Sequence, residues 1–130
     1  MSDYQLGAVE AKFADIIWEN EPISSPELVR KSAEELRWKK STTCTVLKRL
    51  CGKGIFQSQK GVVTSLLSRQ EFYALQSENF VKENFNGSLP AFLAAFSSRQ
   101  NLTDRDVALL RRMVEEYVEE YIWRPSFSHF

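Results

Sequence analysis

Residues 38–54 read WKKSTTCTVLKRLCGKG. This segment is the most informative part of the sequence for predicting the fold. At about 100° per residue, its apolar members fall on one side of a helix and its hydroxyl and basic members on the other. The spacing predicts a helix over residues 42–53. Ser41 is expected to cap its start, and Gly54 is expected to end it.

The two faces of this helix differ in chemistry. The inner face would hold Thr43, Val46, Leu47, Leu50 and Cys51, and the outer face Ser41, Thr45, Lys48 and Gly52, flanked by Thr42, Cys44 and Arg49. Short hydroxyls followed by cations suit a helix in the major groove, because Ser and Thr contact base edges while Arg and Lys bind guanine or phosphate. A solvated amphipathic face is the alternative interpretation.

Two further helices precede this segment. Helical spacing over residues 6–20 places four apolar residues on one face: Val9, Phe13, Ile16 and Ile17. A second helix is expected to start at a Ser24 cap and to bury Leu28, Val29, Ala33 and Leu36.

A hairpin follows the helix of residues 42–53. The β-prone runs 55–59 and 62–67 meet at Lys60-Gly61, which predicts a tight turn. Three helices followed by a hairpin is the order of a winged helix-turn-helix. Trp18 and Trp38 lie beside apolar helix faces and are expected to pack in its core.

The second half of the chain returns to helical patterns. Helices are expected over residues 69–84 and 88–97, and Thr103 is expected to cap a last helix. We therefore predict a mainly α (α+β) fold with three parts: a winged-helix DNA-binding domain at 1–69, a helical dimerisation region at 70–122 and a C-terminal tail at 123–130.

The last helix carries a broad apolar stripe whose members step by three and four residues, and this stripe predicts a partner chain. An ordinary intramolecular core is the alternative. The candidate dimerisation residues are Phe72, Phe80, Phe92, Phe96, Val107, Leu110, Met113, Val114, Tyr117 and Tyr121.

The net charge of zero conceals an uneven distribution. Residues 30–69 contain ten basic and two acidic residues, a local charge of +8, whereas residues 71–130 carry a net charge of −3. A basic segment of this density is typical of a surface that binds nucleic acid.

The residues also exclude several function classes. The single histidine is His129, so a multi-histidine metal site and an internal Ser-His-Asp triad are both excluded. Cys44 and Cys51 are seven positions apart, too far along a helix to form a disulfide. We expect no catalytic residues, no metal and no cofactor. With no apolar run approaching the roughly 18 residues of a membrane span, the expected location is the cytoplasm.

The sequence resembles the penicillinase-repressor family (BlaI/MecI, with the copper-responsive CopY branch) over roughly residues 5–120. The resemblance is carried by Leu6, Glu10 and the runs 15–18, 38–43, 45–47, 49–50, 53–55 and 67–72. It implies a homodimeric winged-helix repressor in the bacterial cytoplasm that binds an inverted-repeat operator. It also places Thr42, Thr45 and Arg49 on the recognition helix and brings the wing near the DNA backbone.

Three features of the sequence depart from the family pattern. Members often carry Lys or Arg where this chain has Cys44, so the operator may have a different sequence. Ala95-Phe96 stands where staphylococcal-type repressors are cleaved at an Asn-Phe bond, and residues 123–130 lack the cysteines of the copper branch. The resemblance therefore implies a separate sensor or protease as a partner without identifying the signal.

The predicted partners are double-stranded DNA and a second copy of the chain, with no membrane. The candidate DNA-binding residues are Trp38, Lys39, Lys40, Ser41, Thr42, Cys44, Thr45, Lys48, Arg49 and Lys60. The alternative function is a winged-helix module whose basic surface docks an acidic protein. For Cys44 two hypotheses stay open: a small residue that fits the groove, or a thiol whose modification weakens operator binding.

Overall fold

The computed structural model describes residues 5–122, so the tail predicted at 123–130 lies outside the described residues. Backbone contacts divide the chain into two compact units, the first ending at Gly87 and the second beginning at Ser88. The predicted domain boundary after residue 69 falls inside the first unit.

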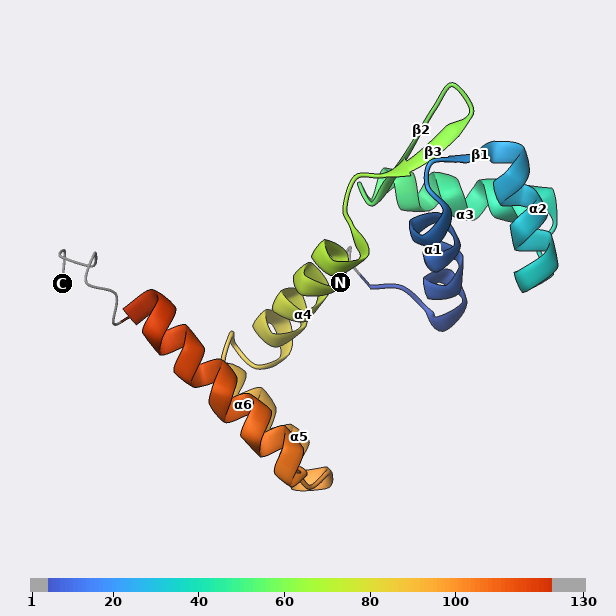
Figure 1. Ribbon diagram of the computed structural model, residues 1–130. Helices are drawn as coiled ribbons and strands as arrows, with labels where there is room; N and C mark the ends of the chain where they lie inside the picture. The colour runs from blue at the N-terminus through green and yellow to red at the C-terminus, as the bar shows by residue number, and fades with distance from the viewer. Residues whose placement is uncertain (1–4, 123–130) are drawn as a thin grey trace. The chain divides into compact units, whose positions relative to one another are not determined.

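The first unit is a winged helix extended by one helix (Figure 1). Its elements are α1 (Ala8–Asn20), β1 (Ile23–Ser24), α2 (Ser25–Leu36), α3 (Lys40–Gly52), β2 (Phe56–Gln59), β3 (Val62–Ser65) and α4 (Arg69–Asn84). The mainly helical fold with a small sheet is confirmed. The sequence predicted the hairpin but not the third strand, β1.

The sheet is antiparallel and has the strand order β1-β3-β2. Val63 in the central strand lies opposite Ile23 on one side and Ser58 on the other. Lys60 and Gly61 form the turn with φ angles of 53° and 76°. Two positive φ angles are typical of a two-residue hairpin turn, and glycine adopts them without strain. The Ser25 amide donates to the Gly61 carbonyl at 2.9 Å, which ties the turn to the start of α2.

One continuous core holds these elements together. Its fully or nearly buried members are Phe13, Ala14, Ile16, Ile17, Ile23, Leu28, Val46, Leu50, Ile55, Phe56, Val63 and Phe72. Because side chains from every helix and strand of the first unit meet in this core, the geometry of α3 is set by the whole unit and not by its own sequence alone.

Several details of the helices differ from the sequence predictions. The α3 helix begins at Lys40 with Lys39 as its N-cap, so the prediction of a Ser41 cap is wrong. The Ser24 cap of α2 is confirmed, its hydroxyl accepting from the Glu27 amide at 3.3 Å. Val9 and Ala33, expected inside, are exposed. On α2, Ser32 is buried one turn after Leu28 and takes the place that Ala33 was expected to fill.

Trp18 joins α1 to the start of α4. Its indole Nε1 donates to the Leu67 carbonyl at 2.9 Å, and its ring lies 5.3 Å from Phe56 and 5.7 Å from Phe72. Phe72 has no exposed surface, which corrects its assignment to the dimer contact: it belongs to the core of the first unit. Trp18 is confirmed as a residue packed against that core.

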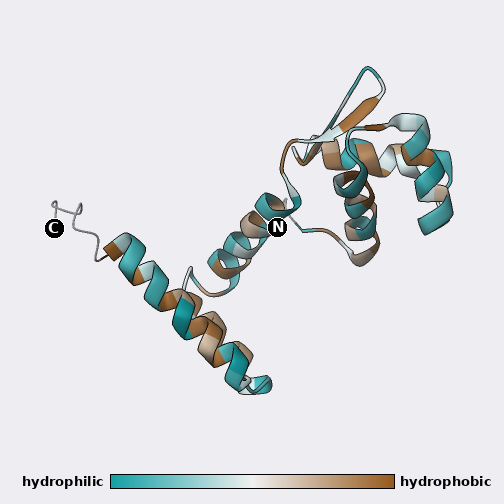
Figure 2. Ribbon diagram, viewed as in Figure 1, coloured by the Kyte–Doolittle hydropathy of each residue, from teal (hydrophilic) through white to brown (hydrophobic). Residues whose placement is uncertain are grey.

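The second unit consists of α5 (Leu89–Arg99), α6 (Asp104–Tyr117) and η1 (Val118–Ile122), a π-helical segment that continues α6. Thr103 caps α6 as predicted, its hydroxyl accepting from the Asp106 amide at 3.0 Å. Figure 2 shows apolar segments recurring along α6 between polar ones. No residue described between 88 and 122 is buried.

Candidate nucleic-acid interface

The two faces of α3 lie as the sequence predicted. Thr43, Val46 and Leu50 are buried, and Leu47 and Cys51 are partly buried against the core. The candidate DNA-binding residues on α3 are all exposed: Lys40, Ser41, Thr42, Cys44, Thr45, Lys48 and Arg49. The helix therefore presents Lys40 and the hydroxyls in its first turns and Lys48 and Arg49 later, all exposed to solvent.

Trp38 lies in the connection between α2 and α3 and does not join this exposed surface. Its ring packs on Phe13 with 5.1 Å between ring centroids, and the residue is partly buried against the core. The expectation of core packing is confirmed. Trp38 therefore holds the start of α3 in place, and its indole is not free to stack on a base.

Four exposed lysines lie on α3, at its N-cap or in the hairpin turn, and form no ion pair within residues 5–122. Lys39 is the N-cap of α3, Lys40 is its first residue, Lys48 lies two turns later, and Lys60 occupies the hairpin turn. Unpaired ammonium groups at exposed positions can bind phosphate without first breaking an internal contact.

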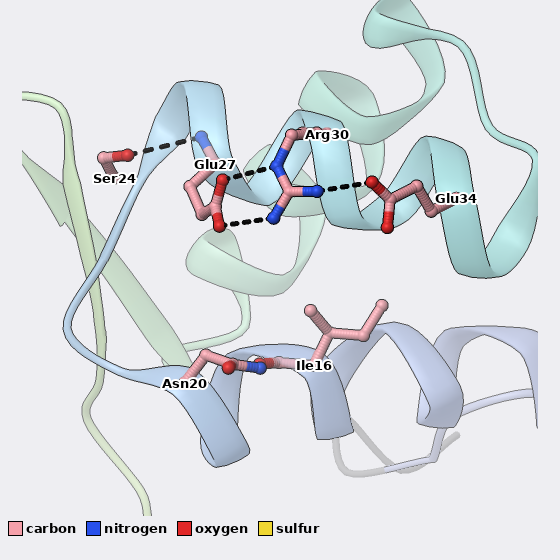
Figure 3. A network of polar contacts seen from close by, with 6 residues as sticks. All are labelled: Ile16, Asn20, Ser24, Glu27, Arg30 and Glu34. Atoms are coloured by element: carbon pink, nitrogen blue, oxygen red, sulfur yellow. Dashed lines mark hydrogen bonds and ion pairs between the residues drawn. The ribbon is translucent and has the colours of Figure 1, made fainter.

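Three of the four arginines of the basic segment, Arg30, Arg49 and Arg69, behave differently because they form ion pairs. Figure 3 shows Arg30 held between two carboxylates of α2. Its Nε and Nη2 atoms lie 2.7 and 2.6 Å from the Glu27 carboxylate oxygens, and Nη1 pairs with Glu34. The guanidinium lowers the pKa of Glu27 through this hydrogen bond. Arg69 pairs with Asp15 at 2.9 Å and with Glu19 at 3.1 Å.

Arg49 on α3 pairs with Glu10 on α1, a contact that the sequence analysis missed. Burial opposes ionisation of Glu10, but the Gly7 amide and the Arg49 guanidinium outweigh it and lower the pKa of the carboxyl group. The two residues are 39 positions apart, so no local pattern signals the pair. Arg30, Arg49 and Arg69 are thus each paired with a carboxylate of the same unit. These ion pairs reduce the positive charge that residues 30–69 offer to a ligand below the formal value of +8.

The base of the wing is fixed by side chains of two neighbouring segments. The Glu21 carboxylate accepts from the Ser65 amide and hydroxyl, each at 2.8 Å. Gln57 Nε2 donates to Thr64 Oγ1 across the hairpin at 3.1 Å. The hairpin therefore holds Lys60 at the end of a supported ribbon.

The predicted dimerisation residues other than the buried Phe72 fall into three groups. Phe80 is exposed on α4, and its ring lies 6.0 Å from Phe85. Phe92 and Leu110 are partly buried in the second unit. The remaining members are exposed on α5, α6 and η1: Phe96, Val107, Met113, Val114, Tyr117 and Tyr121.

No helix between residues 5 and 122 is long and apolar enough to cross a membrane. The same part of the chain contains no group of three or more His, Cys, Asp or Glu side chains that could hold a metal ion.

Comparison with known proteins identifies the family. A family model described as penicillinase repressor matches residues 6–116. The chain belongs to the penicillinase repressor family. It is 23% identical to the penicillinase repressor of Bacillus licheniformis over 117 residues, covering 87% of this chain and 91% of the relative. It is also 21% identical to the methicillin resistance regulatory protein MecI of Staphylococcus aureus, covering 87% of this chain and 95% of the relative.

Membership in the penicillinase repressor family confirms the predicted resemblance and the class of function. The chain is a DNA-binding transcription regulator of the repressor type and not an enzyme.

Proposed function

We propose that this penicillinase repressor family member acts as a homodimer whose two α3 helices enter successive major grooves of an inverted-repeat operator. The observation that carries the proposal is the division of α3 into a buried apolar face and an exposed face of hydroxyls and cations. Bound at a promoter, such a dimer would exclude the transcription machinery.

The exposed side chains divide into two roles. Lys39, Lys40, Lys48 and Lys60 would contact phosphates and set the position of the protein, because they form no ion pair within the described chain. Ser41, Thr42, Cys44, Thr45 and Arg49 would contact base edges and specify the sequence. Trp38 supports the start of α3 through Phe13.

Dimerisation is supported by the second unit. Val114, Tyr117 and Tyr121 are exposed on the stripe of α6 and η1, and the rings of Tyr117 and Tyr121 lie 4.7 Å apart. Exposed apolar side chains at coiled-coil spacing are stabilised when a second copy covers them. Linking two DNA-binding units in one dimer also raises the affinity for DNA, because the second binding event becomes intramolecular.

The signal that releases the repressor would reach it through a separate sensor or protease. The Ala95–Phe96 bond, at the position that resembles a cleavage site, lies inside α5 with both residues exposed. A protease takes an extended substrate, so cleavage there would require local unfolding of α5.

An electrophoretic retardation assay with the promoter upstream of the protein's own gene tests this function. Lys60→Ala should weaken binding to all DNA sequences alike and lower the salt dependence of log K by about one. Lys82→Ala, which removes an exposed lysine from α4, is the matched control and should change neither. Thr45→Val should alter the base preference. An absence of retardation at low salt would contradict DNA binding and favour the protein-docking alternative.

A further inference from the structure

Arg49 differs from the other paired arginines in how many of its nitrogen atoms are occupied. Arg30 donates to its two carboxylate partners from Nε, Nη1 and Nη2, and Arg69 donates from Nε and Nη2. Arg49 donates to Glu10 from Nη2 alone, and its side chain is 52% exposed. Within residues 5–122, its Nε and Nη1 atoms therefore remain available to a ligand.

Glu10 is a fixed anchor for this arginine. It lies in the first turn of α1, where its Oε1 atom accepts from the Gly7 amide at 3.3 Å while Oε2 pairs with Arg49. Its side chain is only 23% exposed. Burial raises the pKa of the carboxyl group, but hydrogen bonds from Gly7 and Arg49 outweigh burial and lower it. The anchor is therefore a carboxylate near neutral pH, and both of its oxygens are occupied.

A second contact joins the start of α1 to the end of α3. Lys53, the C-cap of α3, donates from Nζ to the Gln5 carbonyl at 3.4 Å. Both helices also contribute side chains to the same buried core. The Glu10 carboxylate thus has a set position relative to the backbone of α3, and it restrains the Arg49 guanidinium before any DNA is bound.

The available N–H groups of Arg49 belong to the exposed face of α3. Arg49 follows Thr45 by four residues, and Thr45 follows Ser41 by four residues, so the three side chains form one row along the helix. All three residues are exposed. Arg49 is therefore an anchored guanidinium in line with the hydroxyls of the face that is proposed to enter the major groove.

Guanine is the base that suits these donors. A guanidinium has five N–H groups, and guanine presents two acceptors in the major groove, N7 and O6, which an arginine can contact together. The Glu10 carboxylate offsets the positive charge of Arg49, which weakens its attraction to a phosphate. The N–H groups remain donors all the same, so the pair favours the edge of a base over the DNA backbone.

We propose that Glu10 is a positioning residue for DNA recognition, which holds Nη2 of Arg49 and so directs its remaining N–H groups to N7 and O6 of a guanine in each half-site. This role rests on the proposed function of α3. A long, flexible side chain loses conformational freedom when it binds, and one that is restrained in advance loses less. Glu10 thus strengthens the discrimination of guanine without touching DNA.

The guanine contact is tested with the full chain on the site that it selects from a random duplex library. Each guanine of that site is replaced in turn by 7-deazaguanine, which still pairs with cytosine but lacks N7. In retardation assays, wild type should lose about tenfold in affinity at one guanine of each half-site, and Arg49→Ala should lose nothing further there. A loss at no guanine, or the same loss in Arg49→Ala, would overturn the contact.

Glu10→Gln separates positioning from support of the fold. Glutamine keeps the length of the side chain and an oxygen for the Gly7 amide, but it lacks the charge that holds Arg49. The loss caused by 7-deazaguanine should shrink by about threefold, because a less restrained arginine contributes less to the contact. Affinity for DNA without the site should not fall. An undiminished 7-deazaguanine effect, or an equal loss of affinity on all DNA sequences, would contradict positioning.

Glu19→Gln is the matched control. It removes the same charge from the same helix, at a carboxylate that pairs with Arg69 at the start of α4. The 7-deazaguanine effect should keep its wild-type size, and a reduction equal to that in Glu10→Gln would show a general effect of charge instead of positioning. If the chain retards no DNA, the proposed function and this role fail together. Retardation with an unchanged 7-deazaguanine effect in Glu10→Gln overturns the role alone.

Discussion

The two units of this chain bury their apolar residues in different ways. All the buried apolar residues of the described chain lie between Phe13 and Phe72, whereas no residue described between 88 and 122 is buried. The first unit therefore has a core of its own, while the second exposes the stripe that contains Val114 and Tyr117. This difference fits the proposal that the first unit folds by itself and presents α3, while the second unit is completed by a second copy of the chain.

The largest expected effect comes from placing a charge in the stripe of the second unit. Val114→Glu would bury a carboxylate twice in a two-fold interface and should raise the dimer dissociation constant by about 100-fold or more. Operator affinity should fall at the same time, because the two DNA-binding units are no longer linked in one dimer. Sedimentation equilibrium measures the first effect, and retardation measures the second.

Ala108→Glu is the control for that experiment. It adds the same charge to an exposed position of α6 on the side of the helix opposite the stripe, and it should leave the dimer intact. Retained dimers in Val114→Glu, or equal dissociation in both variants, would show that the stripe is not the interface.

A cavity in the first unit should have the next largest effect. Leu50 is completely buried, so Leu50→Ala should lower the free energy of unfolding by about 2–5 kcal/mol. Leu66→Ala, at an exposed position of the same unit, should stay within about 0.5 kcal/mol of wild type. Urea denaturation followed by tryptophan fluorescence compares them, and equal losses would contradict a self-contained core.

The ion pair between α1 and α3 should make the smallest contribution. Arg49 is about half exposed, so Glu10→Gln should cost no more than about 1 kcal/mol. Because the folded pKa of Glu10 is lowered below 4.5, its stabilising effect is complete above that pH and is lost as the pH falls through the folded pKa. Wild type and Glu10→Gln should therefore differ in stability near neutral pH and converge in strong acid. A difference that persists in strong acid would contradict this origin.

Local patterns predicted much of the first unit and the start of α6 in the second. The hydroxyl caps at Ser24 and Thr103, the turn at Lys60-Gly61 and the two faces of α3 follow from residues within a few positions of one another, and the structure has them as predicted. The helix of residues 69–84 was also predicted at its observed bounds.

What the sequence did not reveal depends on contacts between distant segments. The strand β1 has two residues and exists because Ile23 pairs with Val63. Glu10 and Arg49 form their ion pair only because α1 and α3 pack against each other. Phe72, in the first turn of α4, packs against Trp18 and the core and therefore belongs to the first unit. The periodicity of residues 69–84 could not indicate this packing.

Sequence-specific binding by a dimer is tested by selecting bound DNA from a random duplex library with the full chain. The selection examines the reading face of α3 and the pairing of two copies in one measurement. If two copies bind together, the library should be enriched in an inverted repeat whose half-sites lie about 10 base pairs apart, or a multiple of that distance. Enrichment of a single asymmetric site, or no enrichment at all, would contradict sequence-specific binding by a dimer.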